Sequence, residues 1–290
     1  MRRTYIGFIG LICFAVSVGF ALAQTSGPIT GQWTISGPIV ADQVQLSIRR
    51  YTPGSNMSSS SQVSITQLNG LTRAQFASPV SSLARFDIVR DAGTLRLEGY
   101  LQNGSGGGNF TFIPNPGYAN EMRALGYTDL TDERIFQLAT HDVSLAYIRS
   151  MFSAGIRPES TSKLITMRIH NVSVEFVNEL MALGFTDLKP DKLVTMRIHG
   201  VTAEFGRSLK SMGYNSVSTD QMVTMRIHGV STDFIREIES FGYNHPPIDK
   251  LVTMKIHGIT PDYIRKAQAR GFTNLSIDQL VQLKIHGILE

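Results

Sequence analysis

The chain of 290 residues has one cysteine, Cys13, and one tryptophan, Trp33. Cys13 lies in a leader-like segment that we expect to be removed, so the mature protein has no disulfide framework, thiolate nucleophile or cysteine-ligated zinc. Charged residues make up only 17% of the chain, and the formal charge of +4 falls to near +2 without Arg2 and Arg3. Such a small charge does not indicate a nucleic-acid binder.

The sequence also lacks the short motifs that mark common enzyme classes. The spacings H-E-x-x-H, G-x-S-x-G and G-x-G-x-x-G, the phosphate-binding loop and the EF-hand calcium loop do not occur. We therefore predict no catalytic residue and no cofactor, and we favour a non-enzymatic protein. An unrecognised hydrolase stays open as an alternative.

Residues 1–23 have the pattern of a signal peptide. Arg2 and Arg3 precede an almost wholly apolar run, which ends in an A-x-A motif at Ala23. We expect cleavage before Gln24 and export to the periplasm or the medium. An uncleaved membrane anchor is the alternative, because the apolar run approaches the length that spans a bilayer.

Residues 24–116 are rich in serine, glycine and threonine. Val44, Leu46 and Ile48 alternate with polar residues, which is typical of half-buried strands. Turn sequences occur at 91–94 and 103–108. We predict an antiparallel β meander of about five to seven strands, either a small barrel or a sandwich-like sheet. Trp33 is expected to anchor its core, and a ligand-holding barrel is the alternative.

Residues 117–290 repeat with a period of 29 residues. The motif M-R-I-H at 167–170 returns at 196–199 and 225–228, and in altered form at 254–257 and 283–286. A glycine column that includes Gly184, Gly213 and Gly242 follows the same step. Apolar residues recur at i, i+4 and i+7 before these glycines, which indicates short helices ended by a left-handed residue. We predict an α-solenoid of six helical-hairpin repeats, and hence an α+β protein.

Short helices must bury their apolar residues against neighbouring copies. The second helix of each repeat contains three apolar columns, and we expect all three to pack against neighbouring copies. In one copy these columns are represented by Leu193, Met196 and Ile198. The isoleucine column consists of Ile169, Ile198, Ile227, Ile256 and Ile285.

Six of the seven histidines occupy one repeat position at the end of the second helix. They are His141 in a degraded copy and then His170, His199, His228, His257 and His286. Equivalent residues of adjacent copies lie about 8–10 Å apart, whereas zinc binds nitrogens at about 2.0–2.1 Å. We therefore predict that these histidines are structural, as helix ends, and that they hold no metal.

A column of cations is the candidate binding stripe. It consists of Arg168, Arg197, Arg226, Lys255 and Lys284. The column either complements the helix dipoles in solvent or binds an anionic partner. Residues 117–290 contain 19 basic and 19 acidic residues, and this balance does not favour nucleic acid.

The chain resembles the extracytoplasmic region of some bacterial membrane metallopeptidases of the beta-lactam-sensor type (BlaR/MecR-like). The similar stretches are E-M-R-A-L-G-Y at 121–127, the repeated L-V-T-M-R-I-H-G-V, G-Q-W at 31–33 and R-D-A-G-T at 90–94. The resemblance covers nearly all of the mature chain but not the peptidase domain or its zinc motif. It implies a free-standing exported module that binds a partner in envelope sensing, without peptidase activity.

These observations favour an exported, non-enzymatic binding protein whose repeats are a scaffold for protein–protein interaction. The expected partner is another envelope or extracytoplasmic protein. Binding of a small ligand or an envelope glycan through the β segment is the alternative. Membrane contact is expected only through residues 1–23, if they are not cleaved.

Overall fold

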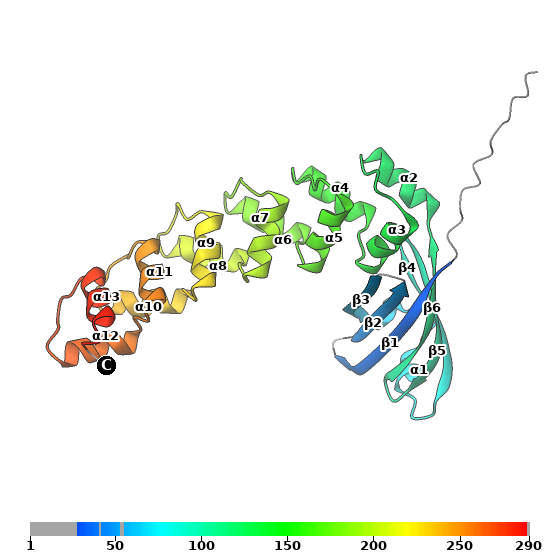
Figure 1. The fold of residues 1–290 in the computed structure, drawn as a ribbon, viewed down its shortest axis with the longest axis horizontal. Helices are drawn as coiled ribbons and strands as arrows, with labels where there is room; N and C mark the ends of the chain where they lie inside the picture. The colour runs from blue at the N-terminus through cyan, green and yellow to red at the C-terminus, as the bar shows by residue number, and fades with distance from the viewer. Residues whose placement is uncertain (1–27, 41, 53–54, 289–290) are drawn as a thin grey trace, which may run out of the picture.

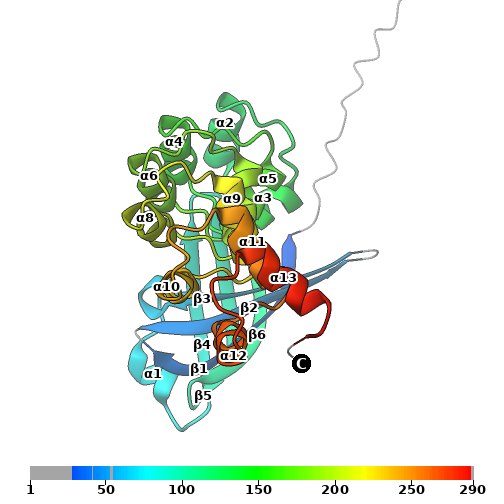
Figure 2. The ribbon, with the colours of Figure 1, turned by 90° about the vertical axis from the view of Figure 1, so that its left-hand side faces the viewer.

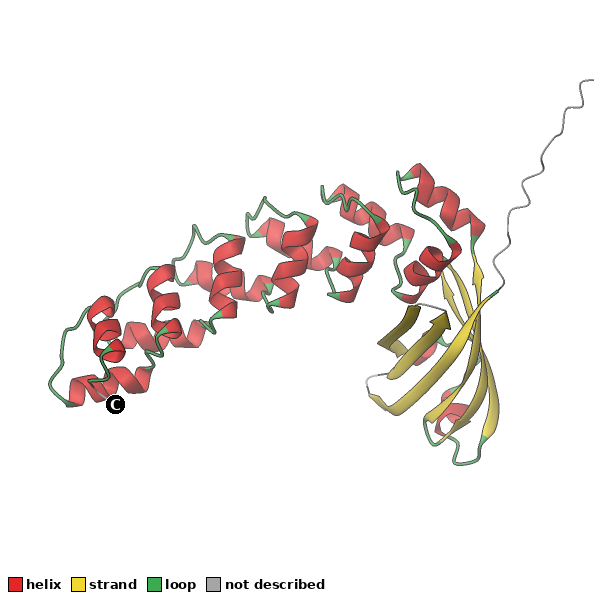
Figure 3. Ribbon diagram, viewed as in Figure 1, coloured by secondary structure: helices red, strands yellow, loops and turns green. Residues whose placement is uncertain are grey.

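The structure, a computed structural model, describes residues 28–40, 42–52 and 55–288. Within these ranges a six-stranded antiparallel sheet is followed by the helices α2–α13, so the fold is of the mixed α+β class (Figures 1 and 3). The expected signal peptide lies outside the described residues. No helix in the described part of the chain is long and apolar enough to cross a membrane.

The sheet is built from two three-stranded meanders. The strands are β1 (Ile29–Val40), β2 (Gln43–Thr52), β3 (Ser55–Ser64), β4 (Ser82–Arg90), β5 (Gly93–Gln102) and β6 (Ser105–Pro114). Their order is β3-β2-β1-β6-β5-β4, so the prediction of a single meander is wrong. The connection from β3 to β4 contains the short helix α1 (Arg73–Ala77) and carries the chain across to the far edge of the sheet. Strands β3 and β4 are therefore the two edges, and they do not pair to close a barrel.

The β5–β6 hairpin has a two-residue turn. Asn103 and Gly104 both have positive φ, 51° and 72°, as the mirror-image turns of tight hairpins require. The glycines at 106–108, which the sequence placed in this connection, lie instead within β6 and pair with β5.

The helices after the sheet form two interleaved series, each helix nine residues long. The first series is α2 (Pro116–Ala124), α4 (Leu145–Ser153), α6 (Val174–Ala182), α8 (Ala203–Ser211), α10 (Thr232–Ser240) and α12 (Pro261–Ala269). The second series is α3 (Asp132–Thr140), α5 (Thr161–Ile169), α7 (Pro190–Ile198), α9 (Thr219–Ile227), α11 (Ile248–Ile256) and α13 (Ile277–Ile285). Successive helices of either series begin 29 residues apart.

Each helix packs against the next member of its own series, as α5 does against α7 and α6 against α8. Figure 2 shows the first series along one side of the row and the second series along the other. Local chemistry fixes the helix ends. Thr202 caps α8 by accepting a hydrogen bond from the N–H of Phe205 at 3.1 Å, and Gly213 follows the same helix with φ of +94°.

The sheet and the helix row share a continuous core at α3. Phe136 of α3 stacks on Phe110 of β6, with ring centroids 5.5 Å apart, and lies 5.3 Å from Phe112. On the sheet side, Trp33 is fully buried and meets Phe86 edge to face at 5.1 Å. Trp33 is therefore a core residue, and α3 joins the two parts of the chain.

Two of the three expected apolar columns are buried, and the third is not. Leu193 and Met196 are completely buried, whereas Ile198 is 55% exposed. The prediction that the isoleucine column packs between copies is wrong. Side chains two positions apart in an α-helix point in directions that differ by roughly 200°. Because the methionine points into the core, the isoleucine two positions later points toward solvent.

Candidate functional site

The five cations of the candidate binding stripe lie over aromatic rings of the preceding first-series helix. The guanidinium carbon of Arg197 is 5.1 Å from the ring centroid of Phe176, and the Lys255 Nζ is 4.0 Å from that of Phe234. The other pairs are Arg168 with Tyr147, Arg226 with Phe205 and Lys284 with Tyr263. We call these five pairs the cation–aromatic ladder. A cation over a ring face is held by the quadrupole of the ring, so the stripe forms contacts within the protein.

Two arginines of the ladder also contact the preceding second-series helix. Arg168 Nε donates to the carbonyl oxygen of His141 at 3.2 Å, and Arg197 Nε donates to that of His170 at 3.3 Å. The last carbonyls of a helix have no partner within that helix. These two guanidinium groups therefore satisfy a helix end of the neighbouring copy and join two copies together.

The histidine column lies at the ends of the second-series helices. His170, His199, His228, His257 and His286 are the residues that directly follow α5, α7, α9, α11 and α13. The backbone N–H of His199, for example, donates to the carbonyl oxygen of Thr195 at 3.1 Å. Within the described residues, no group of three or more histidine, cysteine, aspartate or glutamate side chains is placed to hold a metal ion.

The isoleucine column forms an exposed row on the second-series helices, which we call the isoleucine row. Its members are Ile169, Ile198, Ile227, Ile256 and Ile285, and each is 52–57% exposed. Single exposed apolar residues are common on protein surfaces. A row at one position in five neighbouring helices is different, because helix spacings of about 8–10 Å place the side chains in a line.

The polar groups beside the isoleucine row are already paired. Thr224 Oγ1 donates to the carbonyl oxygen of Asp220 at 3.0 Å within α9. Lys192 of α7 donates to the carboxylate of Asp220 at 3.2 Å, and Lys250 of α11 contacts Asp278 of α13 at 2.6 Å. A shallow groove of about 450 Å³ lies between α7 and α9, and Lys192, Asp220 and Thr224 line it. These polar groups have partners within the protein, whereas each isoleucine of the row is more than half exposed.

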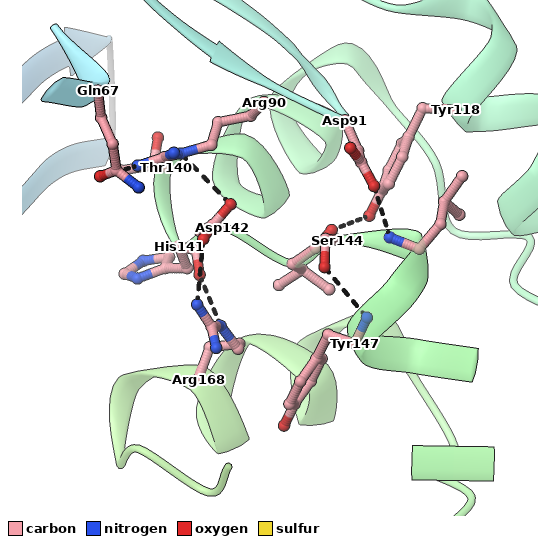
Figure 4. A network of polar contacts seen from close by, with 12 residues as sticks. Gln67, Arg90, Asp91, Tyr118, Thr140, His141, Asp142, Ser144, Tyr147 and Arg168 are labelled. Carbon is pink, nitrogen blue, oxygen red and sulfur yellow. Dashed lines mark hydrogen bonds and ion pairs between the residues drawn. The ribbon is translucent and has the colours of Figure 1, made fainter. Parts of the chain in front are cut away.

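A second arrangement of polar groups lies where the sheet meets the helix row (Figure 4). The Asp142 carboxylate lies between two guanidinium groups, 3.3 Å from Arg90 of β4 and 3.3 Å from Arg168 of α5. Arg90 also donates to Gln67 Oε1 at 3.4 Å. Asp142 has φ of +52°, and the equivalent position is Asn171, also with φ of +52°, in the next copy and glycine in the four copies after it. This carboxylate joins the sheet to the second repeat.

Neighbouring contacts reinforce the same junction. The Asp91 carboxylate accepts a hydrogen bond from the backbone N–H of Leu145 at 2.8 Å, and the Tyr118 hydroxyl donates to the carbonyl oxygen of Val143 at 2.8 Å. Burial, and secondly the charge of Arg168, lower the pKa of His141. The sequence contains one sign of this site, because A-T-H-D at 139–142 departs from R-I-H-N at 168–171 and from R-I-H-G at 197–200 and 226–229.

A polar cleft of about 840 Å³ lies between β3 and the ends of α3 and α5, and we call it the β3 cleft. One wall is the strand segment 58–64, and the other includes Arg90, His141, Asp142, Arg168 and Asn171. Hydroxyl, amide and guanidinium groups dominate this lining. Sequence reasoning missed the cleft, because it joins segments about 80–110 residues apart that carry no shared motif.

Comparison with known proteins assigns the chain to no family. No family model, no curated protein and no solved structure matches it. The isoleucine row and the β3 cleft therefore have to be interpreted from their own geometry.

Proposed function

We propose that this is an exported, non-enzymatic binding protein whose helix pairs form an α-solenoid that presents the isoleucine row to a protein partner. The observation that carries the proposal is the exposure of the five isoleucines, 52–57% each, at one position of five successive helices. Large exposed apolar patches on soluble proteins commonly mark interaction sites. The resemblance to sensor-type extracytoplasmic regions supports a role in envelope sensing.

The contacts between copies support the solenoid. The Tyr127 hydroxyl donates to the carbonyl oxygen of Pro158 at 2.9 Å, and the Tyr214 hydroxyl donates to that of Pro246 at 2.8 Å. Each of these bonds joins one repeat to the next repeat along the chain. A stack held by such bonds, and by the hydrogen bonds of Arg168 and Arg197 to the preceding copy, has stability shared between nearest neighbours. It therefore offers a long and rigid surface.

The partner we propose is another envelope or extracytoplasmic protein that presents apolar side chains along a line. Spacings of about 8–10 Å between helices give the row a length of roughly 32–40 Å. The paired lysines and aspartates beside it form a polar rim, an arrangement found around the apolar centres of protein interfaces. An extended helix or a second repeat array suits this shape better than a small ligand does.

Affinity capture from the native cell envelope tests the proposal. The parent protein is compared with a variant that carries both Ile198→Ser and Ile227→Ser, and with the control Met181→Ser. Met181 is 46% exposed but lies on α6, in the first series. We expect the double variant to lose the partner while the control keeps it. Equal capture by all three proteins would refute the role of the row.

A polar ligand or glycan in the β3 cleft is a second candidate function, because hydroxyl and amide side chains line that cleft. Sugars bind through such groups by hydrogen bonds. This candidate predicts equal binding by the parent and by the isoleucine variants, which separates it from the first proposal.

A further inference from the structure

Strand β3 is an edge strand without the usual protection. It is ten residues long, with the sequence SNMSSSSQVS, and contains no charged residue and no proline. Among the strands that the structure describes, it pairs with β2 alone. Natural edge strands are usually short, or carry lysine, proline or a bulge that prevents another strand from pairing. The free side of β3 therefore offers a row of backbone donors and acceptors.

The β3 cleft follows this free side. Seven successive residues, 58–64, line it. Successive side chains of a strand point to opposite faces of the sheet, so a space that touches all seven must run along the backbone edge. Seven extended residues span about 23 Å, which is the length of one short peptide strand.

The opposite wall of the cleft is positively charged. Arg90 and Arg168 both line it, and Asp142 is the one carboxylate among its lining residues. The Asp142 carboxylate is already shared between the two guanidinium groups at 3.3 Å each. Burial lowers the pKa of His141, which keeps its imidazole neutral at pH 7. The wall thus carries one excess positive charge, while β3 itself contributes none.

We propose that the β3 cleft binds an extended peptide with acidic side chains, which adds to β3 as a seventh strand of the sheet. The backbone of the peptide pairs with β3, as in other cases of strand addition. Alternate side chains point toward α3 and α5, where carboxylates meet Arg90 and Arg168. A second copy of this chain would bring another uncharged β3, which would leave the excess positive charge without a partner.

Three blocked heptapeptides test this proposal by calorimetry with the full protein. In the first, threonine alternates with glutamate; in the second, lysine replaces glutamate; in the third, alternate backbone nitrogens of the first peptide are methylated. We expect the acidic peptide to bind at least tenfold more tightly than either of the others. The lysine peptide tests the charge of the wall, and the methylated peptide tests backbone pairing.

Two proline variants test the position of the peptide. Neighbouring residues of a strand direct their N–H groups to opposite sides, so Ser59→Pro and Ser60→Pro differ in which side loses a donor. One of them breaks the pairing with β2 and lowers Tm. The other keeps Tm near that of the parent, since proline is tolerated on the open side of an edge strand. We expect that stable variant to lose peptide binding at least tenfold.

The proposal is overturned if the methylated peptide binds as well as the unmethylated one, or if the acidic and lysine peptides bind equally. It is also overturned if no peptide binds at millimolar concentration, or if the stable proline variant binds like the parent. A glucuronic acid oligosaccharide is tested in parallel. Its binding to the cleft in the absence of peptide binding would assign the site to an acidic saccharide instead. Ile169 of the isoleucine row lines the cleft, but none of these outcomes involves Ile198 or Ile227, the two residues that test the row.

Discussion

Arg197 joins three helices of the row. Its guanidinium group lies over the ring of Phe176 in α6, with 5.1 Å from carbon to ring centroid, and its Nε donates to the carbonyl oxygen of His170 at the end of α5 at 3.3 Å. The same residue therefore covers an aromatic side chain and completes a helix end in the preceding copy. A column that suggested a binding stripe in the sequence thus forms ring contacts within each repeat and, through Arg168 and Arg197, hydrogen bonds to the preceding repeat.

Replacing Arg197 with methionine should destabilise the protein by about 1–2 kcal/mol, because the change removes a cation–aromatic contact and a charged hydrogen bond. Methionine keeps an apolar side chain over the ring, so the loss of stability measures mainly the contribution of the guanidinium group. The control is Arg207→Met on the exposed side of α8, for which we expect a change below about 0.5 kcal/mol. Urea denaturation followed by circular dichroism measures both, and equal losses would contradict the contact.

The glycine column offers a matched pair of variants. Gly213 and Gly242 have φ of +94° and +92°. A Cβ at Gly213 would lie 3.2 Å from His245 Cε1, whereas a Cβ at Gly242 has no atom within 4 Å. Alanine at Gly242 should cost about 1–2 kcal/mol through the backbone alone, and alanine at Gly213 should cost more. A smaller loss at Gly213 would show that the His245 ring moves away freely.

His141 should make stability depend on pH. Burial, and secondly Arg168, lower its pKa in the folded state, so the unfolded chain binds a proton more readily. The stability that neutral His141 contributes is fully present above the pKa of histidine in the unfolded chain, about 6.5. It is lost as the pH falls through and below that value. His141→Gln should flatten the dependence of Tm on pH between about 5 and 7. His228→Gln is the control, because His228 has the same repeat position but is exposed.

Removing residues 262–290 deletes most of α12 and all of α13. In a nearest-neighbour stack the remaining copies keep their contacts, so the shorter chain should stay folded with a lower Tm. Circular dichroism and size-exclusion chromatography measure this. Complete loss of helical signal would mean that the repeats depend on contacts between distant copies.

The 29-residue period, the two helices per repeat and the left-handed glycines were readable from the sequence, because each is a local property. The sequence did not distinguish the buried Leu193 from the exposed Ile198, and both were expected to be buried. A repeated position shows that equivalent residues share an environment, but not whether that environment is core or solvent. The helical period of 3.6 residues separates core positions from solvent-facing positions only when the bounds of the helix are known.

The order of the strands and the contacts between the sheet and the helix row could not be predicted from the sequence either. Alternation at Val44, Leu46 and Ile48 indicates which face of a strand is buried, but not which strand lies beside it. The pairing of β1 with β6 joins segments far apart in the sequence, such as Ile29 with Phe112. Likewise, Arg90 and Asp142 meet only because α3 packs on the sheet, so no local pattern indicates their ion pair.

Cysteine labelling in the native envelope tests the central claim, that the isoleucine row is a binding surface, most directly. Cys13 is the one cysteine of the chain and is replaced by alanine, and single cysteines are then placed at Ile198, Ile227 and, as a control, Met181. In the purified protein all three should react quickly with a maleimide, because all three positions are about half exposed. In intact envelopes the account predicts that cysteines at Ile198 and Ile227 are protected at least tenfold while the control still reacts. Equal labelling in envelopes and in the purified protein would contradict it.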